Sequence, residues 1–276
     1  MKTYNCGSGK IYSIPMSDIE YIGYFYGKSG SEYVKSAYSR LKQFRGTAPD
    51  FVFNAELFDF KTRKAVSDVV SGGTVHKLGE NYGIAFPNNK TAVFSYKNNV
   101  KAKDYVGAYP VLIKGGKIES SIPSGLGGSR GRTAIGVGGG NFYAALIPDG
   151  SNDVTLTTLR NYMKSAGATD AINLDGGGST QFYAPNGNFF TNRPVRGFIA
   201  IWLKKPNTST PTPVEVQKAD VRTVKVRTSL NVRSGAGILH KRVGKLYNGN
   251  KVTVLEEKNG WARIENGWVS SKYLVK

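Results

Sequence analysis

A single carboxylate followed by three glycines is the stretch best suited to chemistry. The segment AINLDGGGSTQ, residues 171–181, places Asp175 at the end of an apolar run. Consecutive glycines lose much backbone entropy and contribute no packing, which indicates a need for bare backbone, such as N–H groups that cradle an anion or a sugar. The alternative is ordinary turn chemistry, because Asp-Gly is a common turn dipeptide. The candidate ligand contacts are Gly176, Gly177, Gly178, Ser179 and Thr180.

Two amphipathic helices and many short strands must position this loop. Apolar residues recur at helical spacing over residues 31–44 and 155–166, each followed by a glycine suited to a C-cap, Gly46 and Gly167. Strands are predicted where β-branched or aromatic runs alternate with Gly, Asn or Pro. Their ranges are 50–58, 82–86, 91–96, 109–118, 132–137, 141–147, 171–175, 180–184 and 197–203. Because strands outnumber helices, the sequence predicts an α+β fold with mixed β-sheets and few helices.

A linker rich in Pro and Thr separates two predicted domains. Residues 206–218 lack hydrophobic periodicity and are typical of a semi-extended linker. The first domain is expected over 1–205. Five short strands separated by Gly or Asn turns predict a small all-β barrel over 219–276.

The C-terminal domain resembles the bacterial SH3-like family. The resemblance is carried by LNVRSGAG (230–237), by GKLYNGNKVTVLEEKNGWARI (244–264) and by GWVSSKYL (267–274). It implies a module without catalysis that binds the bacterial cell wall, often its peptidoglycan. The wall is therefore the expected partner of residues 219–276.

The formal charge of +19 limits the classes of partner. Such a basic chain is attracted to polyanions, which include nucleic acid, anionic lipid and the phosphate-rich wall polymers of Gram-positive bacteria. No nucleic-acid-binding motif accompanies the charge, so no specific nucleic acid is expected. The lone Cys6 excludes an internal disulfide framework, and two histidines in different domains, His76 and His240, argue against a zinc site or a His-based triad. We expect no metal or cofactor, and a structural calcium ion has no readable signature here.

No segment is predicted to enter a membrane. The start MKTYNCGSGKIYSIP has no apolar core of signal-peptide length, and no apolar run approaches about 18 residues. The expectation is synthesis in a cytoplasm, that of a host cell for a phage protein, and action at the bacterial wall after release.

The first domain resembles the phosphodiester glycosidase family between Phe53 and Trp202. The matching motifs are FNAELFD (53–59), DVVSGG (68–73), YPVLIKGGKI (109–118), GRTAIGV (131–137), ALIPDG (145–150), AINLDGGGST (171–180) and NRPVRGFIAI (192–201). The resemblance implies hydrolysis of a sugar-1-phosphodiester, with the C1–O bond broken and a phosphomonoester released. A leaving phosphate with a second pKa of about 6 departs readily, so arginine is the residue expected opposite it.

Three arginines are candidates for holding the phosphate. Arg132 is the first choice, because it begins a strand directly after the glycine-rich loop 125–131 and a guanidinium matches phosphate oxygens bidentately. Arg196 and Arg193, beside the last predicted strand, come second. A lone His76 is more often structural, although it is a further candidate for phosphate contact.

Asp175 is the carboxylate expected at the anomeric carbon, as a nucleophile or as the group that holds the attacking water. A second carboxylate must come from Glu56, Asp59 or Asp149, and Asp149 in Pro-Asp-Gly suits a turn. The family commonly shows Asn-Gly-Gly-Phe-Phe where this chain has Asn54-Ala55-Glu56-Leu57-Phe58. Glu56 is either a catalytic or sugar-binding residue peculiar to this chain, or it points outward. Asn54 fits the family pattern and either bonds sugar or orders the loop.

Two functions from different classes follow. The first is a wall-directed, phage-lysin-like phosphodiester glycosidase acting on an N-acetylglucosamine-1-phosphodiester-like bond, such as the one that joins teichoic acid to peptidoglycan. The second is a noncatalytic wall-glycan-binding or adhesion protein that retains a sugar-phosphate pocket, motivated by Glu56 in place of glycine.

Overall fold

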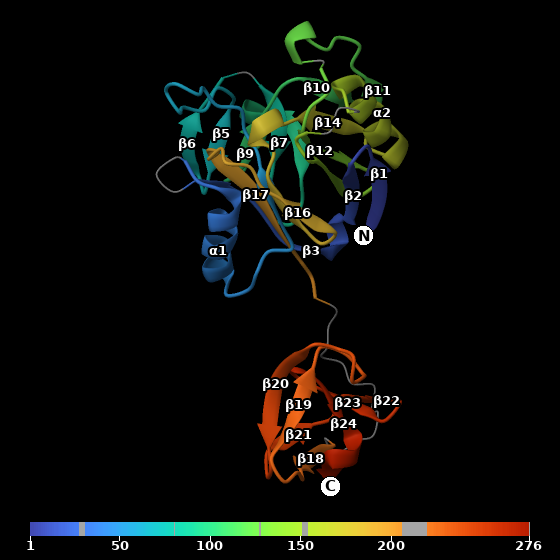
Figure 1. The fold of residues 1–276 in the computed structure, drawn as a ribbon. Coiled ribbons are helices and arrows are strands. Elements are labelled where there is room, and N and C mark those ends of the chain that lie inside the picture. The colour runs from blue at the N-terminus through green and yellow to red at the C-terminus, as the bar shows by residue number, and fades with distance from the viewer. Residues whose placement is uncertain (28–30, 80, 127, 151–153, 206–219, 276) are drawn as a thin grey trace. The chain divides into compact units, whose positions relative to one another are not determined.

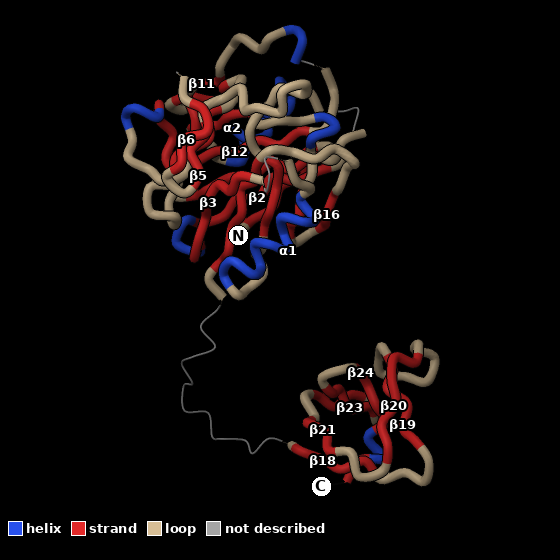
Figure 2. The backbone as a smooth tube through the Cα atoms, turned by 90° about the vertical axis from the view of Figure 1, so that its left-hand side faces the viewer, coloured by secondary structure: helices blue, strands red, loops and turns tan. Residues whose placement is uncertain are grey.

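The chain divides into two compact units, Met1–Pro206 and Asn207–Lys276. The computed structural model describes residues 1–27, 31–79, 81–126, 128–150, 154–205 and 220–275. The predicted linker 206–218 lies outside these residues. Strands dominate both units (Figure 2), which confirms the predicted α+β class for the first unit and the all-β class for the second.

A seven-stranded antiparallel sheet carries the glycine loop on one of its central strands. Its order is β1-β2-β13-β12-β14-β10-β11. Its strands are β1 (Lys2–Cys6), β2 (Gly9–Pro15), β10 (Val111–Lys114), β11 (Lys117–Ile118), β12 (Arg132–Gly138), β13 (Asn141–Ile147) and β14 (Asp170–Asn173). Asp175 follows β14 by two residues, so the sheet delivers the carboxylate at the end of a buried strand.

Two five-stranded sheets complete the first unit (Figure 1). One has the order β16-β15-β4-β17-β3, with strands β3 (Ile19–Tyr26), β4 (Phe51–Asn54), β15 (Phe182–Ala184), β16 (Gly187–Phe189) and β17 (Gly197–Leu203). The other has the order β6-β5-β9-β7-β8, with strands β5 (Val69–Ser71), β6 (Thr74–Lys77), β7 (Tyr82–Ala85), β8 (Val93–Tyr96) and β9 (Tyr105–Gly107).

The main core lies between the seven-stranded sheet and the β3–β17 sheet. Alternate residues of β12 and β13, such as Ile135 and Phe142, pack there with Phe51 and Ile199 from the facing sheet. The opposite face of β12 and β13 packs against the helix of residues 156–166, and the opposite face of β4 and β17 packs against the helix of residues 34–45. This alternation follows from the two-residue period of a strand and produces a helix–sheet–sheet–helix arrangement.

Each helix covers the outer face of one sheet, and both are visible in Figure 1. The first, α1 (Val34–Arg45), packs on the β4–β17 face, and the second, α2 (Leu156–Ala166), packs on the seven-stranded sheet. Both predicted helices are confirmed, and each ends at a glycine with a left-handed φ, +70° at Gly46 and +108° at Gly167. The Thr155 hydroxyl caps α2 by accepting a hydrogen bond from a main-chain N–H of the first turn.

The second unit consists of two small antiparallel sheets. Their orders are β21-β18-β25 and β20-β19-β24-β23-β22. The strands are β18 (Val221–Val224), β19 (Ser229–Arg233), β20 (Arg242–Tyr247), β21 (Lys251–Thr253), β22 (Glu256–Lys258), β23 (Trp261–Ile264), β24 (Gly267–Ser270) and β25 (Leu274–Val275). The expected five strands are therefore eight in the described part of this unit, because turns divide the longer runs. A core that includes Leu230, Val232, Ala262 and Val269 lies between the sheets.

Among the described residues, no helix has the length and apolar character needed to cross a membrane. The longest helix, α1, has 12 residues.

Candidate active site

The three glycines of the loop after β14 each have a steric reason. A Cβ at Gly176 would lie 2.8 Å from the Gly131 carbonyl oxygen, and one at Gly178 would lie 2.9 Å from Cζ of Arg193. Gly177 has a φ of +56°, which side chains of L-residues disfavour. The glycines therefore make room for the protein's own chain and for a guanidinium group at the loop.

Two main-chain N–H groups of this loop donate hydrogen bonds within the protein, whereas the sequence predicted that they face a ligand. The N–H of Gly176 donates to Oδ1 of Asp175 at 3.0 Å, and the N–H of Gly177 donates to the Gly131 carbonyl at 2.8 Å. Ser179 and Thr180, two of the candidate ligand contacts, are fully buried, so their hydroxyls are not exposed at the surface of the loop.

Asn54 lies beneath the loop and holds it to β4 and β12. Its Nδ2 donates to the Asp175 carbonyl at 2.7 Å, while its Oδ1 accepts from the Thr133 hydroxyl at 2.8 Å and from the Gln181 N–H at 3.1 Å. The side chain is fully buried. Of the two alternatives open for Asn54, these contacts favour ordering the loop.

We expect the Asn54→Ala substitution to lower the free energy of unfolding by about 2–4 kcal/mol, because it leaves buried donors and acceptors without partners. Urea denaturation of the full chain, followed by tryptophan fluorescence, measures the change. The exposed Asn98 provides a matched control, and Asn98→Ala is expected to change the value by less than about 0.5 kcal/mol. Equal stability of the two variants would contradict the supporting role of Asn54.

Asp175 is nearly buried, with 9% of its surface exposed. Burial raises the pKa of its carboxyl to about 6, while the Ser179 hydroxyl, the Gly176 N–H and the charge of Arg193 oppose that rise. Its Oδ2 accepts no hydrogen bond of normal geometry. Asp175 is therefore ionised near neutral pH, and its Oδ2 is buried.

Glu56 follows β4 and points into the protein, which decides between the two alternatives open for it. It is 2% exposed, and burial raises the pKa of its carboxyl to about 8, with the charge of Asp175 adding to the rise. The nearby Tyr24 hydroxyl acts in the opposite direction. Glu56 is therefore a neutral carboxylic acid at pH 7. It lies close enough to Asp175 for the negative charge of Asp175 to raise the pKa of Glu56.

The remaining carboxylate candidates have structural contacts of their own. Asp59 caps an exposed turn by accepting from the N–H groups of Lys61 and Thr62. Asp149 accepts from the Gly131 N–H at 2.9 Å and so fixes the chain beside the glycine loop. Of the three candidates, only Glu56 shares the site with Asp175. Two carboxyl groups whose pKa values are held apart in this way can divide the roles of acid and base.

Arg193 is the guanidinium that lies against the glycine loop. Its Nη1 donates to the Ser179 hydroxyl at 3.3 Å, and its Cζ lies 4.8 Å from the centre of the Phe60 ring. Its carbonyl accepts from Nε2 of Gln181 at 2.5 Å, which fixes its main chain. Arg193 is partly exposed, so its remaining donors are available to an anion.

Arg132 has a different place from the one expected of a phosphate clamp. Its guanidinium is 2% exposed and donates to the carbonyls of Leu126 and Gly128, in the preceding loop. Alternation along β12 turns Arg132 away from the sheet face that bears Thr133 and its Asn54 partner. These contacts engage the Arg132 guanidinium within the protein, whereas the Arg193 guanidinium lies against the glycine loop.

Arg130 is a site residue that the sequence did not single out. Its Cδ lies 3.7 Å from the Cβ position of Gly177, and the side chain is partly exposed. The sequence feature that could have identified Arg130 as a site residue is its position in the glycine-rich loop before β12. Arg130 and Arg193 therefore flank the glycine loop with two positive charges.

Arg196 and His76 belong to a second polar cluster that reaches Glu56 through Tyr24. Arg196 donates to the Tyr26 hydroxyl, and the ring of Tyr26 stacks on the ring of His76 at 3.7 Å between centres. The charge of Arg196 acts on the Tyr24 hydroxyl, the same group that lowers the pKa of Glu56. The alternating tyrosines of β3 carried no sequence signal, because tyrosine is common in strands.

No group of three or more His, Cys, Asp or Glu side chains in the described residues is arranged to hold a metal ion. The side chains gathered at the loop are two carboxyls, a hydroxyl and guanidinium groups. Their chemistry suits an anionic carbohydrate.

This fold and site define a three-sheet α+β domain with a carboxylate–glycine loop, followed in the chain by a small all-β domain. A model of the phosphodiester glycosidase family matches residues 49–202, and a model of the bacterial SH3 domain matches residues 228–275. The chain belongs to the phosphodiester glycosidase family, which places it among the hydrolases.

Among solved structures, the chain is similar to the catalytic domain of zebrafish N-acetylglucosamine-1-phosphodiester alpha-N-acetylglucosaminidase, auto-inhibited by its pro-peptide. The TM-score is 0.56 at 17% identity, over 71% of this chain and 77% of that one. A hypothetical protein from Synechocystis matches with a TM-score of 0.56 at 13% identity, over 74% of this chain and 61% of that chain. At these identities the likeness establishes the fold.

Two curated relatives match over short segments. The chain is 52% identical over 52 residues to the putative N-acetylmuramoyl-L-alanine amidase YrvJ of Bacillus subtilis, which is 17% of this chain and 10% of that protein. It is 46% identical over 54 residues to the probable endopeptidase p60 of Listeria innocua, again 17% of this chain and 12% of that protein. The chain thus spans about a tenth of the length of these relatives.

Proposed function

We propose that the chain hydrolyses a sugar-1-phosphodiester in the bacterial cell wall. The observation that carries the proposal is the pairing, at one glycine loop, of an ionised carboxylate, Asp175, with a neutral carboxylic acid, Glu56, beside the guanidinium of Arg193. Membership of the phosphodiester glycosidase family supports this reaction class.

Each group has a role that follows from its charge. Arg193, with Arg130 beside it, binds the phosphate oxygens of the substrate. Asp175 faces the anomeric carbon, where its free oxygen attacks C1 or holds the water that does so. The C1–O bond breaks, the oxygen of water ends on C1, and the phosphomonoester leaves as an anion stabilised by the guanidinium groups.

Glu56 acts as an uncharged hydrogen-bond donor. A neutral carboxylic acid donates a hydrogen bond to a phosphate oxygen or a sugar hydroxyl without repelling the anionic substrate. The leaving phosphate requires little acid assistance, so we assign Glu56 mainly to this hydrogen bond.

The finer assignment concerns the substrate. We propose an N-acetylglucosamine-1-phosphodiester of the type that joins teichoic acid to peptidoglycan in Gram-positive walls, reached by a phage-lysin-like protein after release from the cell that makes it. Support comes from the bacterial SH3 domain, from relatives whose names describe an amidase and an endopeptidase, and from the net charge of +19, which favours an anionic wall.

The direct test is incubation of the full chain with an alkyl N-acetylglucosamine-1-phosphodiester, followed by proton and phosphorus NMR. The expected products are the reducing sugar and the alkyl phosphomonoester, and the first anomer formed reveals whether configuration is retained. Purified walls are expected to release a phosphate-bearing polymer. Wall binding without any turnover on either substrate would instead identify a noncatalytic glycan-binding protein.

The Arg193→Lys substitution is expected to lower kcat/KM about tenfold or more, because an ammonium group does not reproduce the bidentate contact with phosphate. Arg132→Lys is the matched comparison. We expect it to reduce stability, through the lost contacts to Leu126 and Gly128, while KM stays within about twofold. Steady-state kinetics and thermal unfolding of both variants separate the two roles. The reverse pattern would return the clamp to Arg132.

A further inference from the structure

A groove in the second unit has the charge of an anion-binding site. It has a volume of about 820 Å³. Four of its lining residues are cationic: Lys225, Arg227, Arg233 and Lys272. No Asp or Glu is present among the described residues that line it. A concave surface of one sign concentrates the field and attracts ligands of the opposite charge.

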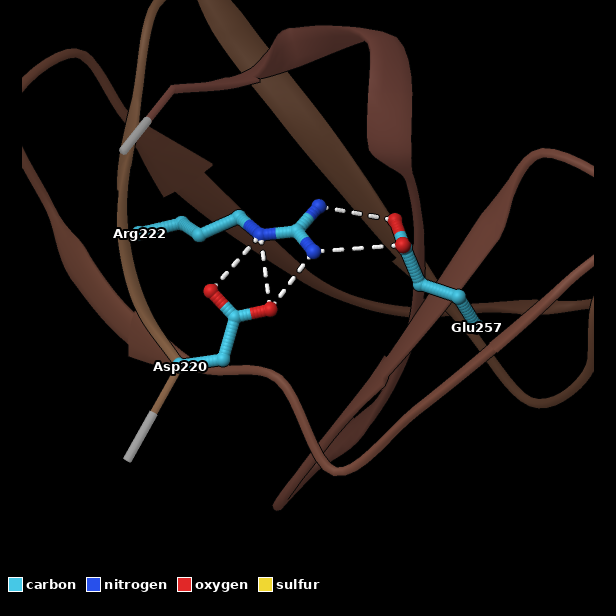
Figure 3. A network of polar contacts seen from close by, with 3 residues as sticks. All are labelled: Asp220, Arg222 and Glu257. Atoms are coloured by element: carbon cyan, nitrogen blue, oxygen red, sulfur yellow. Dashed lines mark hydrogen bonds and ion pairs between the residues drawn. The ribbon is translucent and has the colours of Figure 1, made fainter. Parts of the chain in front are cut away.

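Three of the four acidic residues in the described part of this unit are paired outside the groove. Arg222 binds Asp220 at 2.5 Å and Glu257 at 2.8 Å, as Figure 3 shows, and Arg263 binds Glu256 at 3.2 Å. These three carboxylates are consequently engaged by two arginines that do not line the groove.

The cations of the groove keep their charge for a ligand. In the described part of the chain, no ion pair involves Lys225, Arg227, Arg233 or Lys272. Nη1 of Arg233 donates a hydrogen bond to the His240 carbonyl at 2.8 Å, which orients the guanidinium. The other N–H groups of this guanidinium remain available to a ligand. The groove thus presents four uncompensated positive charges.

Two aromatic rings give the groove a carbohydrate character. Trp261, half-buried, and Tyr273, exposed, line the same concavity, and the ammonium of Lys272 lies 4.8 Å from the centre of the Tyr273 ring. Aromatic faces pack against the apolar faces of sugar rings, while the adjacent cations pair with phosphate. Rings and cations line the same groove, which offers contacts for both the sugars and the phosphates of a phosphodiester-linked glycan.

We infer that this groove binds an anionic glycan polymer linked by phosphodiesters. The choice of a wall polymer rests on the proposed function of the first unit, whereas the anionic character rests on the groove alone. Binding the polymer that carries the bond to be cut raises the local substrate concentration for a tethered catalytic unit.

The test is co-sedimentation of the full chain with purified Gram-positive walls, before and after removal of the phosphate polymer with cold hydrofluoric acid. We expect the affinity for stripped walls to fall about tenfold, and the binding to intact walls to weaken as salt increases. The double variant R227Q/K272Q is expected to bind intact walls about tenfold more weakly. The matched control K251Q/K258Q removes two exposed lysines outside the groove and is expected to stay within twofold of the unsubstituted chain.

Equal binding to intact and stripped walls, or equal binding by the two double variants, would overturn the inference. Duplex DNA and anionic lipid vesicles serve as competing polyanions, and a groove-dependent affinity for either that matches the affinity for walls would also overturn it. Arg227 and Lys272 are exposed, so their substitution is expected to leave the fold intact. Circular dichroism of each variant checks that a loss of wall binding does not come from misfolding. Binding that persists without release of phosphomonoester would count against the proposed function and leave this inference standing.

Discussion

The Asp175→Asn variant is expected to hydrolyse a sugar-1-phosphodiester at least about 10³-fold more slowly than the unsubstituted chain. Asparagine keeps the size of the side chain and still accepts the hydrogen bond from the Gly176 N–H through its Oδ1. It removes the negative charge that faces the anomeric carbon, and with it both the nucleophile and the group that stabilises an oxocarbenium-like transition state. Single-turnover kinetics with excess enzyme measures the chemical step.

The matched control is Asp59→Asn. Asp59 accepts its hydrogen bonds in an exposed turn, so the variant is expected to retain kcat within about twofold. Residual activity above about a tenth in the Asp175 variant would remove Asp175 from the reaction. Unchanged thermal unfolding of the same variant is required before a loss is assigned to chemistry.

The Glu56→Gln variant is expected to lose about tenfold in kcat/KM and to change the shape of the pH profile, because the amide donates a weaker hydrogen bond than the carboxylic acid. Activity requires ionised Asp175, so it rises as pH increases through about 6. It also requires protonated Glu56, so it falls as pH increases through about 8. Glutamine does not titrate, and the variant is therefore expected to lose the alkaline limb while it keeps the acid limb.

A stability measurement on the same variant tests the buried position of Glu56 independently of catalysis. The pKa of this carboxyl is about 8 in the folded chain against an ordinary value of 4.5, so the stabilisation is complete below pH 4.5 and is lost as pH rises through 8. The free energy of unfolding should fall over this window in the unsubstituted chain, and this contribution should be absent in the variant. An alkaline limb that persists in Glu56→Gln would assign it to another group.

The position of the glycine loop was predictable because the signals for it are local. An apolar run followed by Asp-Gly-Gly-Gly predicts a buried strand that ends at a carboxylate, and β14 confirms the strand. The helices were equally local, since the spacing of apolar residues and a following glycine mark both their faces and their ends. The strands of residues 2–26, by contrast, were missed, and they supply Tyr24 and Tyr26 to the site.

The choice of arginine shows where local reasoning stopped. Arg132 precedes a strand and follows a flexible loop, a context that suits phosphate binding. Its side chain instead pairs with carbonyls of residues 126 and 128, because a strand turns successive residues to opposite faces. Which face a strand-end residue occupies depends on what packs against each face, and that is a property of the assembled sheets.

By itself, the sequence determined the two-domain organisation expected around a Pro/Thr-rich segment, both helices and several strands of the first domain, and the carboxylate and glycines of the loop, because each rests on residue types close together in the chain. Tertiary structure alone decided that Glu56 is buried beside Asp175, that Asp59 and Asp149 are not, and that Arg193 reaches the loop. The physical reason is that the pKa of a group and its pairing with a charge depend on burial and on distance. Burial and distance are in turn set by segments more than a hundred residues apart in sequence, such as β4 and the loop after β14, which meet only when the sheets pack.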